Sequence, residues 1–476
     1  MILSSIAWRN IGRNRKRSLI VMTAVAIGVA AGVFACGLII GWSNQRIDAV
    51  IHVEQGHINL FHPEFLNNED IEKSIPESND VLQFLEQQPE IKAIAKRYLV
   101  SALASTPYGT TSLMLNGVDP EIEMLVSELH TKTINPESVY LNPLDENTIF
   151  ISEKTAEDLR IKCYVLDEAA LDSLHALGIP ENLIVRLIPF AGKRFNTLKQ
   201  FQRSLQTVFS QKELSRYGAH LSTAALRYRL RSKIVFTITD KNGALVNETF
   251  RVCGIFKTDN AAFDRKNAFV PAKNLYPICG LQKNEIHEIV ILLDEHSQLS
   301  SVQNSIKKAY PKLGVYNWKA LVPDAGMMSD YMSLFNYIIL GFILFALAFG
   351  IINTMLMSVL ERTKELGMLM AIGMSRKKIF GMIVLETTYL SLSGASIGMF
   401  IGWVVIFITG KTGLHFESVG EGFEAIGWSS SVYPSITPDY FFGISLMVVA
   451  VSILSSIAPA IKALRLRPIE ALKSDN

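Results

Sequence analysis

Four long runs without charged residues constrain this chain more than any other feature. They lack Asp, Glu, Lys and Arg, and they cover residues 18–42, 331–360, 387–410 and 440–461. Since a helix rises about 1.5 Å per residue, roughly 20 apolar residues cross the hydrocarbon core of a bilayer. Only 19% of the residues are charged, against roughly 25% in soluble domains. The sequence therefore excludes disorder and an ordinary soluble enzyme, and it predicts four transmembrane helices, at 18–42, 331–360, 379–410 and 440–461.

Basic residues indicate the orientation of these helices. Lys and Arg gather before the first helix, between the second and third, and after the fourth. Because cytoplasmic segments carry the excess of Lys and Arg, we expect residues 1–17, 361–378 and 462–476 in the cytoplasm. The segment 43–330 and the loop 411–439 then lie on the extracytoplasmic side of the membrane. The first run is too long and too rich in glycine for a cleaved signal peptide, so we expect it to stay in the membrane.

The segment 43–330 reads as a folded domain. Short β-rich runs occur at 57–61, 98–105, 149–152, 234–239, 249–256 and 288–293, and helical patterns occur at 80–88, 120–129 and 297–310. The expected fold class is therefore an α-helical membrane protein with four transmembrane helices and a large mixed α+β extracytoplasmic domain between the first two.

Residues 163–231 interrupt the β-rich pattern and predict a helical insert. Asp167 precedes one helical pattern, and Phe195, Leu198, Phe201, Leu205 and Val208 follow a second one. Ten Lys or Arg lie between Lys193 and Lys233, against the single acid Glu213. This basic character suits either a solvated amphipathic helix pair, which we favour, or a docking surface for an acidic partner or anionic lipid head groups.

The sequence offers no catalytic, nucleotide or metal motif. The string TGKTG at 409–413 resembles the end of a phosphate-binding loop, but Val405 stands where that motif requires glycine. His52, His57 and His62 recur every five residues, whereas zinc ligands on one helix face need spacings of three or four. We therefore expect no metal site and no catalysis by this chain. Three cysteines lie outside the first helix, and a Cys253–Cys279 disulfide is left open.

The predicted membrane helices contain small residues rather than a polar relay. Glu386 is the only acid or base within the four spans and their immediate continuation, and a hydrophilic conduit normally needs several such groups. Glycines recur four residues apart, at Gly28 and Gly32 and at Gly394 and Gly398. Such faces allow helices to approach closely. They serve either as dimer or sliding contacts or as ordinary packing within one chain.

The link between the second and third helices is the most informative segment, and here a resemblance to a known family emerges. The pattern ERTKELGMLMAIGMSRKKI at 361–379, followed by Glu386, Gly394 and Gly398, resembles the FtsX-like ABC transporter permeases of the mechanotransmission group. Residues 7–30 resemble that family's amphipathic N-terminal helix and first span, and PAIKALRLRPIEAL at 459–472 resembles its closing motif. GHINLF at 56–61 and NGVDPEIE at 116–123 are similar to the LolC and LolE lipoprotein-releasing type, which is related to MacB.

The resemblance implies a permease subunit that transmits ATP-driven motion to the extracytoplasmic domain. It implies two copies of a separate cytoplasmic ABC ATPase, which bind ATP and Mg, and a second permease subunit, identical or homologous. The residues expected to couple to the ATPase are Glu361, Arg362, Glu365, Gly367, Ala371, Gly373 and Ser375.

This resemblance is compatible with three alternative functions. Lipoprotein release from the inner membrane fits the external motifs. MacB-type efflux of peptides, toxins or drugs would need a periplasmic adaptor. A non-transporting FtsX-like regulator of cell-wall hydrolases is the third. The partners expected are membrane lipid and a lipoprotein or periplasmic protein, and no nucleic acid is expected.

Overall fold

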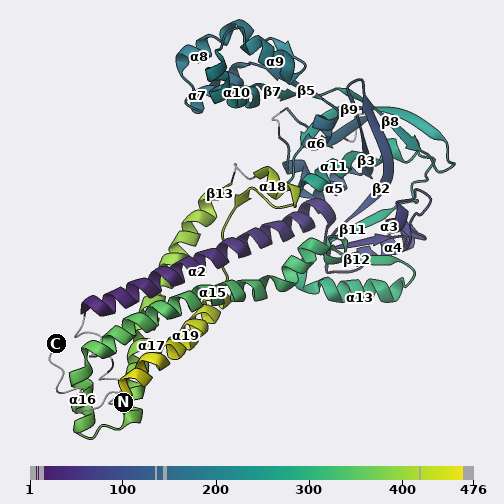
Figure 1. The fold of residues 1–476 in the computed structure, drawn as a ribbon. Coiled ribbons are helices and arrows are strands. Elements are labelled where there is room, and N and C mark those ends of the chain that lie inside the picture. Colours follow the sequence, from purple (N-terminus) through teal and green to yellow (C-terminus); the bar gives the residue numbers. More distant parts are fainter. Residues whose placement is uncertain are drawn as a thin grey trace. The chain divides into compact units, whose positions relative to one another are not determined.

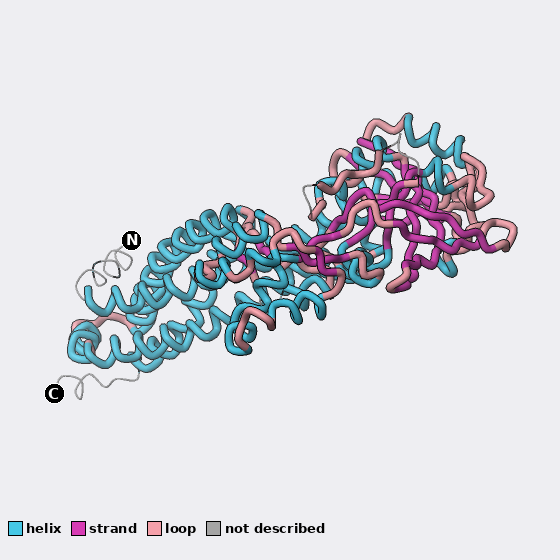
Figure 2. The backbone as a smooth tube through the Cα atoms, turned by 90° about the horizontal axis from the view of Figure 1, so that it is seen from above, coloured by secondary structure: helices cyan, strands magenta, loops and turns pink. Residues whose placement is uncertain are grey.

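The computed structural model describes residues 7, 9, 15–134, 137–142, 147–416 and 420–464. Most of the predicted amphipathic helix at 1–17 and of the tail at 462–476 lies outside the described residues. The chain divides into two compact units. The first unit comprises residues 1–47, 324–421 and 429–476, and the second comprises 48–323 and 422–428. Long helices make up the first unit, and strands gather in the second (Figure 1, Figure 2).

The first unit contains four helices long and apolar enough to cross a membrane. They are α2 (Arg15–Ala49), α15 (Pro323–Glu361), α17 (Arg376–Thr412) and α19 (Pro438–Leu464). Shorter elements are α16 (Thr363–Ala371), β13 (Leu414–His415), α18 (Gly420–Ala425) and β14 (Ser431–Val432). Each long helix extends past the charge-free run from which it was predicted, and α2 runs on into the π-helix η1 (Val50–Gln55).

Valines at four-residue spacing form the centre of the first unit. Val21, Val25, Val29 and Val33 line one face of α2 and are buried together with Leu340 of α15 and neighbours from α17 and α19. Residues four apart lie one above the other on a helix, so this face gives α2 a continuous contact surface. Among apolar helices in lipid, such close packing supplies much of the association energy.

The second unit is built on a nine-stranded sheet in the order β12-β1-β11-β2-β3-β10-β4-β9-β8. Its strands are β1 (Ile58–Phe61), β2 (Ile91–Thr106), β3 (Gly109–Val118), β4 (Thr148–Ser152), β8 (Lys233–Thr239), β9 (Leu245–Phe256), β10 (Asn267–Pro271), β11 (Glu288–Leu293) and β12 (Gly314–Asn317). The helices around it are α3 (Phe65–Asn68), α4 (Ser78–Glu86), α5 (Pro120–Val126), η2 (Glu128–Thr131), α6 (Glu153–Asp158), α11 (Ala261–Lys266), α12 (Ala272–Leu275), η4 (His296–Gln298), α13 (Leu299–Ala309) and α14 (Trp318–Leu321).

The long strand β2 closes part of this sheet into a ring. Residues 91–97 of β2 pair with β11, whereas residues 102–105 pair with β8. Since β8 also pairs with β9, the strands β2, β3, β10, β4, β9 and β8 form a closed barrel. β11, β1 and β12 continue the sheet from the first half of β2. Closure removes the open edge that β8 would otherwise expose.

Aromatic side chains fill the core of this sheet. Phe150, Phe256 and Phe269 are buried, with ring centroids 5.1 Å apart for the first pair and 5.9 Å for the second. All six β-rich runs predicted from the sequence lie in strands of the sheet, and a hairpin turn with Gly243 at φ +80° joins β8 to β9. The mixed α+β domain is therefore confirmed. The strands β3, β10 and β12 were not predicted.

The segment 163–231 is not purely helical, because it also contains a small sheet in the order β6-β5-β7. Its elements are β5 (Lys162–Val165), α7 (Glu168–Ala176), α8 (Glu181–Val185), η3 (Ile188–Phe190), β6 (Arg194–Phe195), α9 (Leu198–Leu205), α10 (Gln211–Ala225) and β7 (Leu226–Tyr228). Asp167 caps α7 by accepting from the Ala170 N–H at 2.8 Å, whereas Phe195 lies in β6 rather than in the predicted second helix. Strands of two to four residues are too short to show alternation in the sequence.

This insert has a hydrophobic core of its own. Tyr164 stacks on Phe201 with ring centroids 5.5 Å apart, and Leu174, Leu187 and Leu221 are buried around them. Several of its basic residues are engaged locally: Arg227 pairs with Asp167 at 2.6 Å, and Arg186 pairs with Glu213 at 3.3 Å.

The cysteines are thiols rather than disulfides. The Cys253 thiol donates to the Ile149 carbonyl oxygen at 3.2 Å. Burial raises the pKa of the Cys279 thiol to about 12. The Cys253–Cys279 bridge considered above is therefore not part of the structure.

A buried carboxyl in the second unit gives its stability a pH dependence. Burial raises the pKa of Asp264 to about 7, although hydrogen bonds from Thr258 oppose the rise. The Thr258 hydroxyl donates to Asp264 Oδ1 at 2.6 Å, and the Thr258 N–H donates to Oδ2 at 3.1 Å. Between the ordinary pKa of 3.8 and about 7, the folded chain therefore binds more protons at this group than the unfolded chain.

We expect the free energy of unfolding of the second unit to fall as the pH rises from 4 to 7. A raised folded-state pKa favours the protonated folded form, and the loss amounts to about 1.4 kcal/mol per pH unit for one group. Thermal unfolding at several pH values measures this slope, and Asp264→Asn should remove it. An Asp264→Asn variant with the full wild-type slope would contradict the assignment to Asp264.

Candidate coupling site

The link between α15 and α17 is held by one arginine. Arg362 lies between α15 and α16, and its Nε donates to Glu365 Oε2 at 2.9 Å. Its Nη1 donates to both carboxylate oxygens of Glu386 on α17, at 3.1 and 3.2 Å. The planar guanidinium presents several N–H groups in a fixed geometry, so one side chain can bind two carboxylates at once. Arg362 thus ties the ends of α15 and α16 to α17.

The two ion pairs of Arg362, with Glu386 and with Glu365, form the two arms of this contact, and they differ in burial. The Glu386 side chain is 9% exposed and that of Arg362 18%, whereas the Glu365 side chain is 44% exposed. Coulombic attraction is stronger where water is excluded, so the Arg362–Glu386 contact is the stronger arm. Sequence reasoning identified Glu386 as the single acid in the spans but did not assign it to the site. Arg362 lies in the link before α17 and is not at a helical spacing from Glu386. The sequence therefore gives no sign that these two residues pair.

The turn after α16 presents apolar and basic side chains to solvent. Ile372 is 77% exposed and Met368 is 53% exposed, and the side chains of Arg376, Lys377 and Lys378 at the start of α17 are also exposed. Exposed large apolar side chains beside charges are typical of a protein contact. This exposed surface of Met368, Ile372 and residues 376–378 is called the link surface below.

Two predicted residues shape the turn that carries the link surface. Gly373 has φ +98°, a conformation that L-residues rarely adopt, and Ser375 starts α17, with its carbonyl accepting from the Lys378 N–H at 2.9 Å. Ala371 is exposed at the end of α16, whereas Gly367 is buried in its middle. Glu361 is exposed at the end of α15. The seven predicted coupling residues are thus brought into one helix and turn, but Arg362 points inward instead of presenting its charge.

The four predicted packing glycines contact helices of the same chain. A Cβ at Gly398 would lie 2.4 Å from the Ala26 carbonyl oxygen, and one at Gly394 would lie 2.7 Å from that of Met22. On α2, a Cβ at Gly28 would meet the Leu347 side chain at 2.4 Å, and one at Gly32 would meet that of Leu340 at 3.1 Å. These faces therefore bring α17 and α15 close to α2.

We expect Gly398→Ala to destabilise the first unit by about 1–3 kcal/mol, because the added methyl group overlaps backbone that cannot rotate away. Gly381→Ala on the same helix is the matched control, since nothing lies within 4 Å of its Cβ position. Thermal unfolding in mild detergent compares the two variants. Equal transition temperatures would show that the close approach of α17 to α2 does not limit stability.

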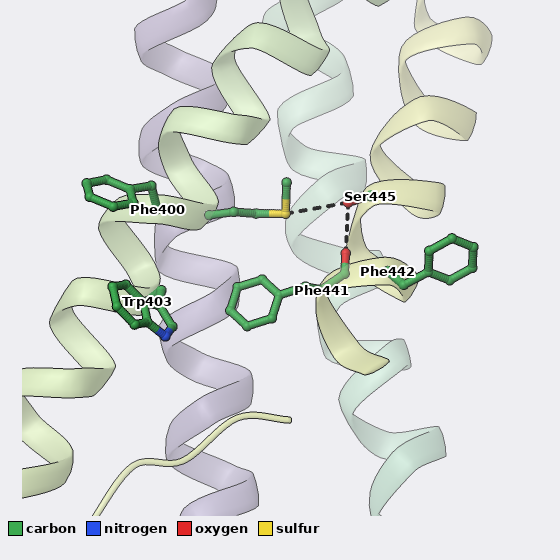
Figure 3. Close-up of a pocket in the computed structure, with 6 residues that line it drawn as sticks. Phe400, Trp403, Phe441, Phe442 and Ser445 are labelled. Carbon is green, nitrogen blue, oxygen red and sulfur yellow. Dashed lines mark hydrogen bonds between the residues drawn. The ribbon is translucent and has the colours of Figure 1, made fainter. Parts of the chain in front are cut away.

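An apolar groove lies on the outside of α17 and α19 (Figure 3). It has a volume of about 470 Å³ and is lined by Met399, Phe400, Trp403, Phe441, Phe442 and Ser445. The Ser445 hydroxyl donates to the Phe441 carbonyl oxygen at 2.8 Å and lies 3.6 Å from Met399 Sδ. Its polar group is therefore satisfied within the helix, and the groove suits hydrocarbon rather than a polar solute.

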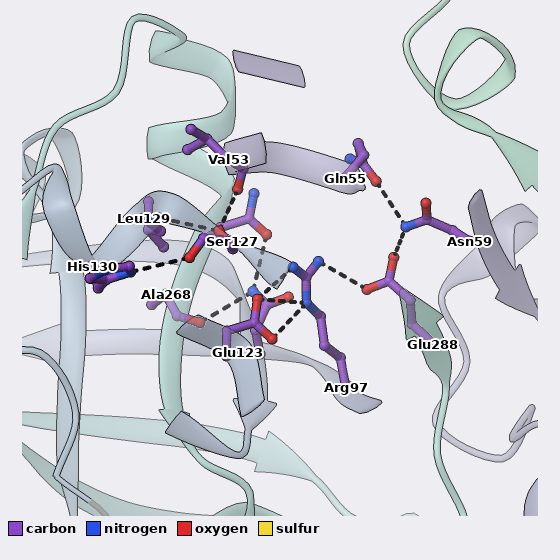
Figure 4. A network of polar contacts seen from close by, with 12 residues as sticks. Val53, Gln55, Asn59, Arg97, Glu123, Ser127, Leu129, His130, Ala268 and Glu288 are labelled. Carbon is purple, nitrogen blue, oxygen red and sulfur yellow. Dashed lines mark hydrogen bonds and ion pairs between the residues drawn. The ribbon is translucent and has the colours of Figure 1, made fainter. Parts of the chain in front are cut away.

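The motif at 116–123 has structural roles in the second unit. Figure 4 shows Arg97 pointing toward Glu123 and Glu288, at 2.6 and 3.3 Å. Asn59 donates to Glu288 at 2.6 Å, and Asp119 caps α5 by accepting from the Glu121 N–H. Burial raises the pKa of Glu288, and the positive charge of Arg97 opposes that rise. This network joins β1, β2, β11 and α5.

The remaining sequence candidates do not form sites. The TGKTG string lies at the end of α17, where Gly413 terminates the helix. His52 and His57 are in edge contact with ring centroids 6.1 Å apart. Among the described residues, no group of three or more His, Cys, Asp or Glu side chains is placed to hold a metal ion.

A protein-family model matches the C-terminal part of the chain. Residues 337–468 match the model of the FtsX-like permease C-terminal family. By this match, the segment is similar to the permease domain of the FtsX-like family. It contains α16, the link surface and the Arg362–Glu386 pair.

Curated relatives are ABC transporter permeases at low identity. The chain is 27% identical over 207 residues to the macrolide export ATP-binding/permease protein MacB of Rhodopirellula baltica, and the match covers 40% of this chain and 27% of that protein. An uncharacterized ABC transporter permease of Methanocaldococcus jannaschii is 26% identical, covering 48% and 56%. Another, YknZ of Bacillus subtilis, is 25% identical, covering 51% and 59%. The chain spans between about a quarter and three fifths of the length of these relatives.

Two solved structures also match at low similarity. One is the extracellular domain of the noncanonic ABC-type transporter YknZ from Gram-positive bacteria, with 13% identity, a TM-score of 0.29, and coverage of 55% of this chain and 99% of that chain. The other is the periplasmic region of MacB from Actinobacillus actinomycetemcomitans, with 11% identity, a TM-score of 0.30, and coverage of 59% and 97%.

Proposed function

We propose that the chain is the permease subunit of an ABC transporter and that the link surface receives a separate cytoplasmic ATPase. The observation that carries this proposal is the position of α16. It connects two long helices, exposes Ile372 and Met368, and is tied to α17 through Arg362. A partner that pushes on α16 would therefore move α15 and α17 together. ATP and Mg would be bound by the ATPase, and this chain would perform no catalysis.

The orientation in this proposal follows from the positive-inside rule. The basic residues 376–378 favour a cytoplasmic link surface, which would put residues 43–330 on the outer side of the membrane. Glu386, the single acid of the spans, is paired with Arg362. The chain would therefore do mechanical work on the outer side instead of moving a polar solute along a charged relay.

The cargo we propose is an acylated lipoprotein released from the outer leaflet. Support comes from the segments GHINLF and NGVDPEIE, which resemble the lipoprotein-releasing type. A second candidate is MacB-type export through a periplasmic adaptor, since several relatives are named as macrolide exporters. We propose a second permease subunit, identical or homologous, in either case.

Purification from the native membrane in mild detergent, followed by mass spectrometry, tests the proposal. A stoichiometric ABC ATPase with acylated lipoproteins is the expected result. An ATPase with an adaptor protein would replace the cargo and keep the coupling role. The absence of any ATPase, in a preparation that retains ATPases of other membrane complexes, would contradict the proposal.

A further inference from the structure

A lysine-rimmed cavity in the second unit has no role in the coupling mechanism. It has a volume of about 280 Å³ and lies between β2, the end of β3, the end of β10 and α12. Its lining combines cationic and flat apolar side chains: Lys96, Tyr98, Pro120, Pro271, Tyr276 and Lys283. All of these belong to the second unit, so the cavity does not depend on how the two units are placed.

The floor of the cavity is held rigidly by aromatic contacts. The rings of Tyr98 and Tyr276 have centroids 5.5 Å apart at an interplanar angle of 35°. The Tyr98 hydroxyl donates to the Lys283 carbonyl oxygen at 2.6 Å, which fixes the segment that carries the Lys283 side chain. The floor is therefore preorganised, and a ligand that binds there need not order it.

The floor of the cavity requires a glycine at position 117, within the 116–123 motif. Gly117 is the cross-strand neighbour of Tyr98. A Cβ at Gly117 would lie 2.9 Å from Leu275 Cδ2 and 3.2 Å from Tyr98 Cβ. Only glycine lets α12 approach β3 and β2 closely enough to bring Tyr276 onto Tyr98. The motif thus builds the cavity as well as the buried network.

The rim of the cavity carries positive charge. Lys96 and Tyr98 are two residues apart on β2 and so share one face of the strand. The side chains of Lys96 and Lys283 are exposed, and neither ammonium group forms an ion pair within the part of the chain that the structure describes. Lys273 on α12 adds a third cationic lining residue. The rim is therefore complementary to negative charge.

The cavity suits separated carboxylates better than one compact phosphate. A phosphate site usually draws on backbone N–H groups at a helix start. At α5, however, Pro120 has no N–H and the Asp119 carboxylate already accepts from the Glu121 N–H. Flat tyrosine and proline surfaces together with lysines from separate segments instead fit an extended chain with acidic side chains.

We propose that this cavity binds an acidic peptide segment of a partner protein, with Lys96 and Lys283 receiving its carboxylates and the Tyr98–Tyr276 floor receiving its apolar atoms. This inference does not rest on the coupling role of α16. It goes beyond that role because it assigns a recognition surface to the large domain.

Fluorescence anisotropy of the full chain in mild detergent tests the inference. The probe is fluorescein-labelled octaglutamate, with octaglutamine as the neutral comparison. Lys96→Gln combined with Lys283→Gln should weaken binding about tenfold at low salt, since exposed ion pairs contribute modestly one by one. Tyr276→Ala should weaken binding with all charges retained. Lys307→Gln combined with Lys308→Gln on α13 is the matched control and should leave the affinity unchanged.

Three results would overturn the inference. Equal loss in the α13 control would mean that octaglutamate responds only to overall charge. Displacement of the probe by inorganic phosphate at matched ionic strength would assign the site to a compact anion. Unchanged affinity in both the Lys96/Lys283 and Tyr276 variants would remove the cavity as the binding site.

Discussion

Replacing Ile372 with aspartate should release the ATPase from the permease. Ile372 is the most exposed large apolar side chain of the link surface, so its replacement costs the free chain little stability. A central apolar contact of an interface commonly contributes 2 kcal/mol or more, which corresponds to about a 30-fold loss of affinity. A charge placed there would also have to be desolvated on binding. Co-purification of the ATPase in mild detergent measures the loss.

A matched variant separates the contact from a general effect of adding charge. Leu245 in the second unit is 72% exposed, so Leu245→Asp makes the same chemical change at a comparable exposure away from α16. It should retain the ATPase at the wild-type ratio. If Ile372→Asp retains it equally well, the link surface is not where the ATPase binds.

Replacing Glu386 with glutamine should uncouple ATP hydrolysis from work on the outer side. The change removes the stronger partner of Arg362 and leaves a mostly buried guanidinium with Glu365 alone, at a cost of about 3 kcal/mol. α16 would then no longer be tied to α17, so the ATPase would still bind but its motion would not be passed on. ATP turnover and cargo release, measured together in reconstituted vesicles, report this separation.

The two arms of Arg362 provide the internal comparison. Glu365→Gln removes the exposed arm and should cost under about 1 kcal/mol, with coupling largely retained. Arg362→Gln combined with Glu386→Gln should be less destabilising than the sum of the two single changes, because it leaves no buried charge without its partner. Strictly additive effects would show that the pair does not couple α16 to α17.

The membrane helices could be predicted from the sequence because their signal is local. The apolar character of a run such as 440–461 can be recognised from its own residues, without knowing what it packs against. The six predicted strands could be recognised for the same reason, because each one contains enough β-branched or apolar residues of its own. β10 escaped prediction because Asn267, Ala268 and Pro271 belong to residue types that are depleted in strands. β3 escaped prediction because Asn116 and Gly117, residue types that are depleted in strands, interrupt its buried half.

The contacts that define the candidate sites could not be predicted from local sequence patterns. Arg362 and Glu386 are 24 residues apart, and their pairing depends on how α16 folds back onto α17. Arg97 meets Glu288 across 191 residues through the sheet. The sequence marked Gly117 and Asp119 only as parts of a family motif, whereas the structure gives each a steric or capping reason. Pairings of this kind follow from topology and not from periodicity.

The central claim is that ATP binding by an ATPase docked on the link surface moves the large domain. Hydrogen exchange of the permease–ATPase complex, with a hydrolysis-deficient ATPase and with or without ATP, tests it most directly. The account predicts that ATP changes the exchange of residues 48–55 and 323–330, which connect the two units, and that Glu386→Gln abolishes this change while the ATPase stays bound. Identical exchange with and without ATP in the wild-type complex would contradict the claim.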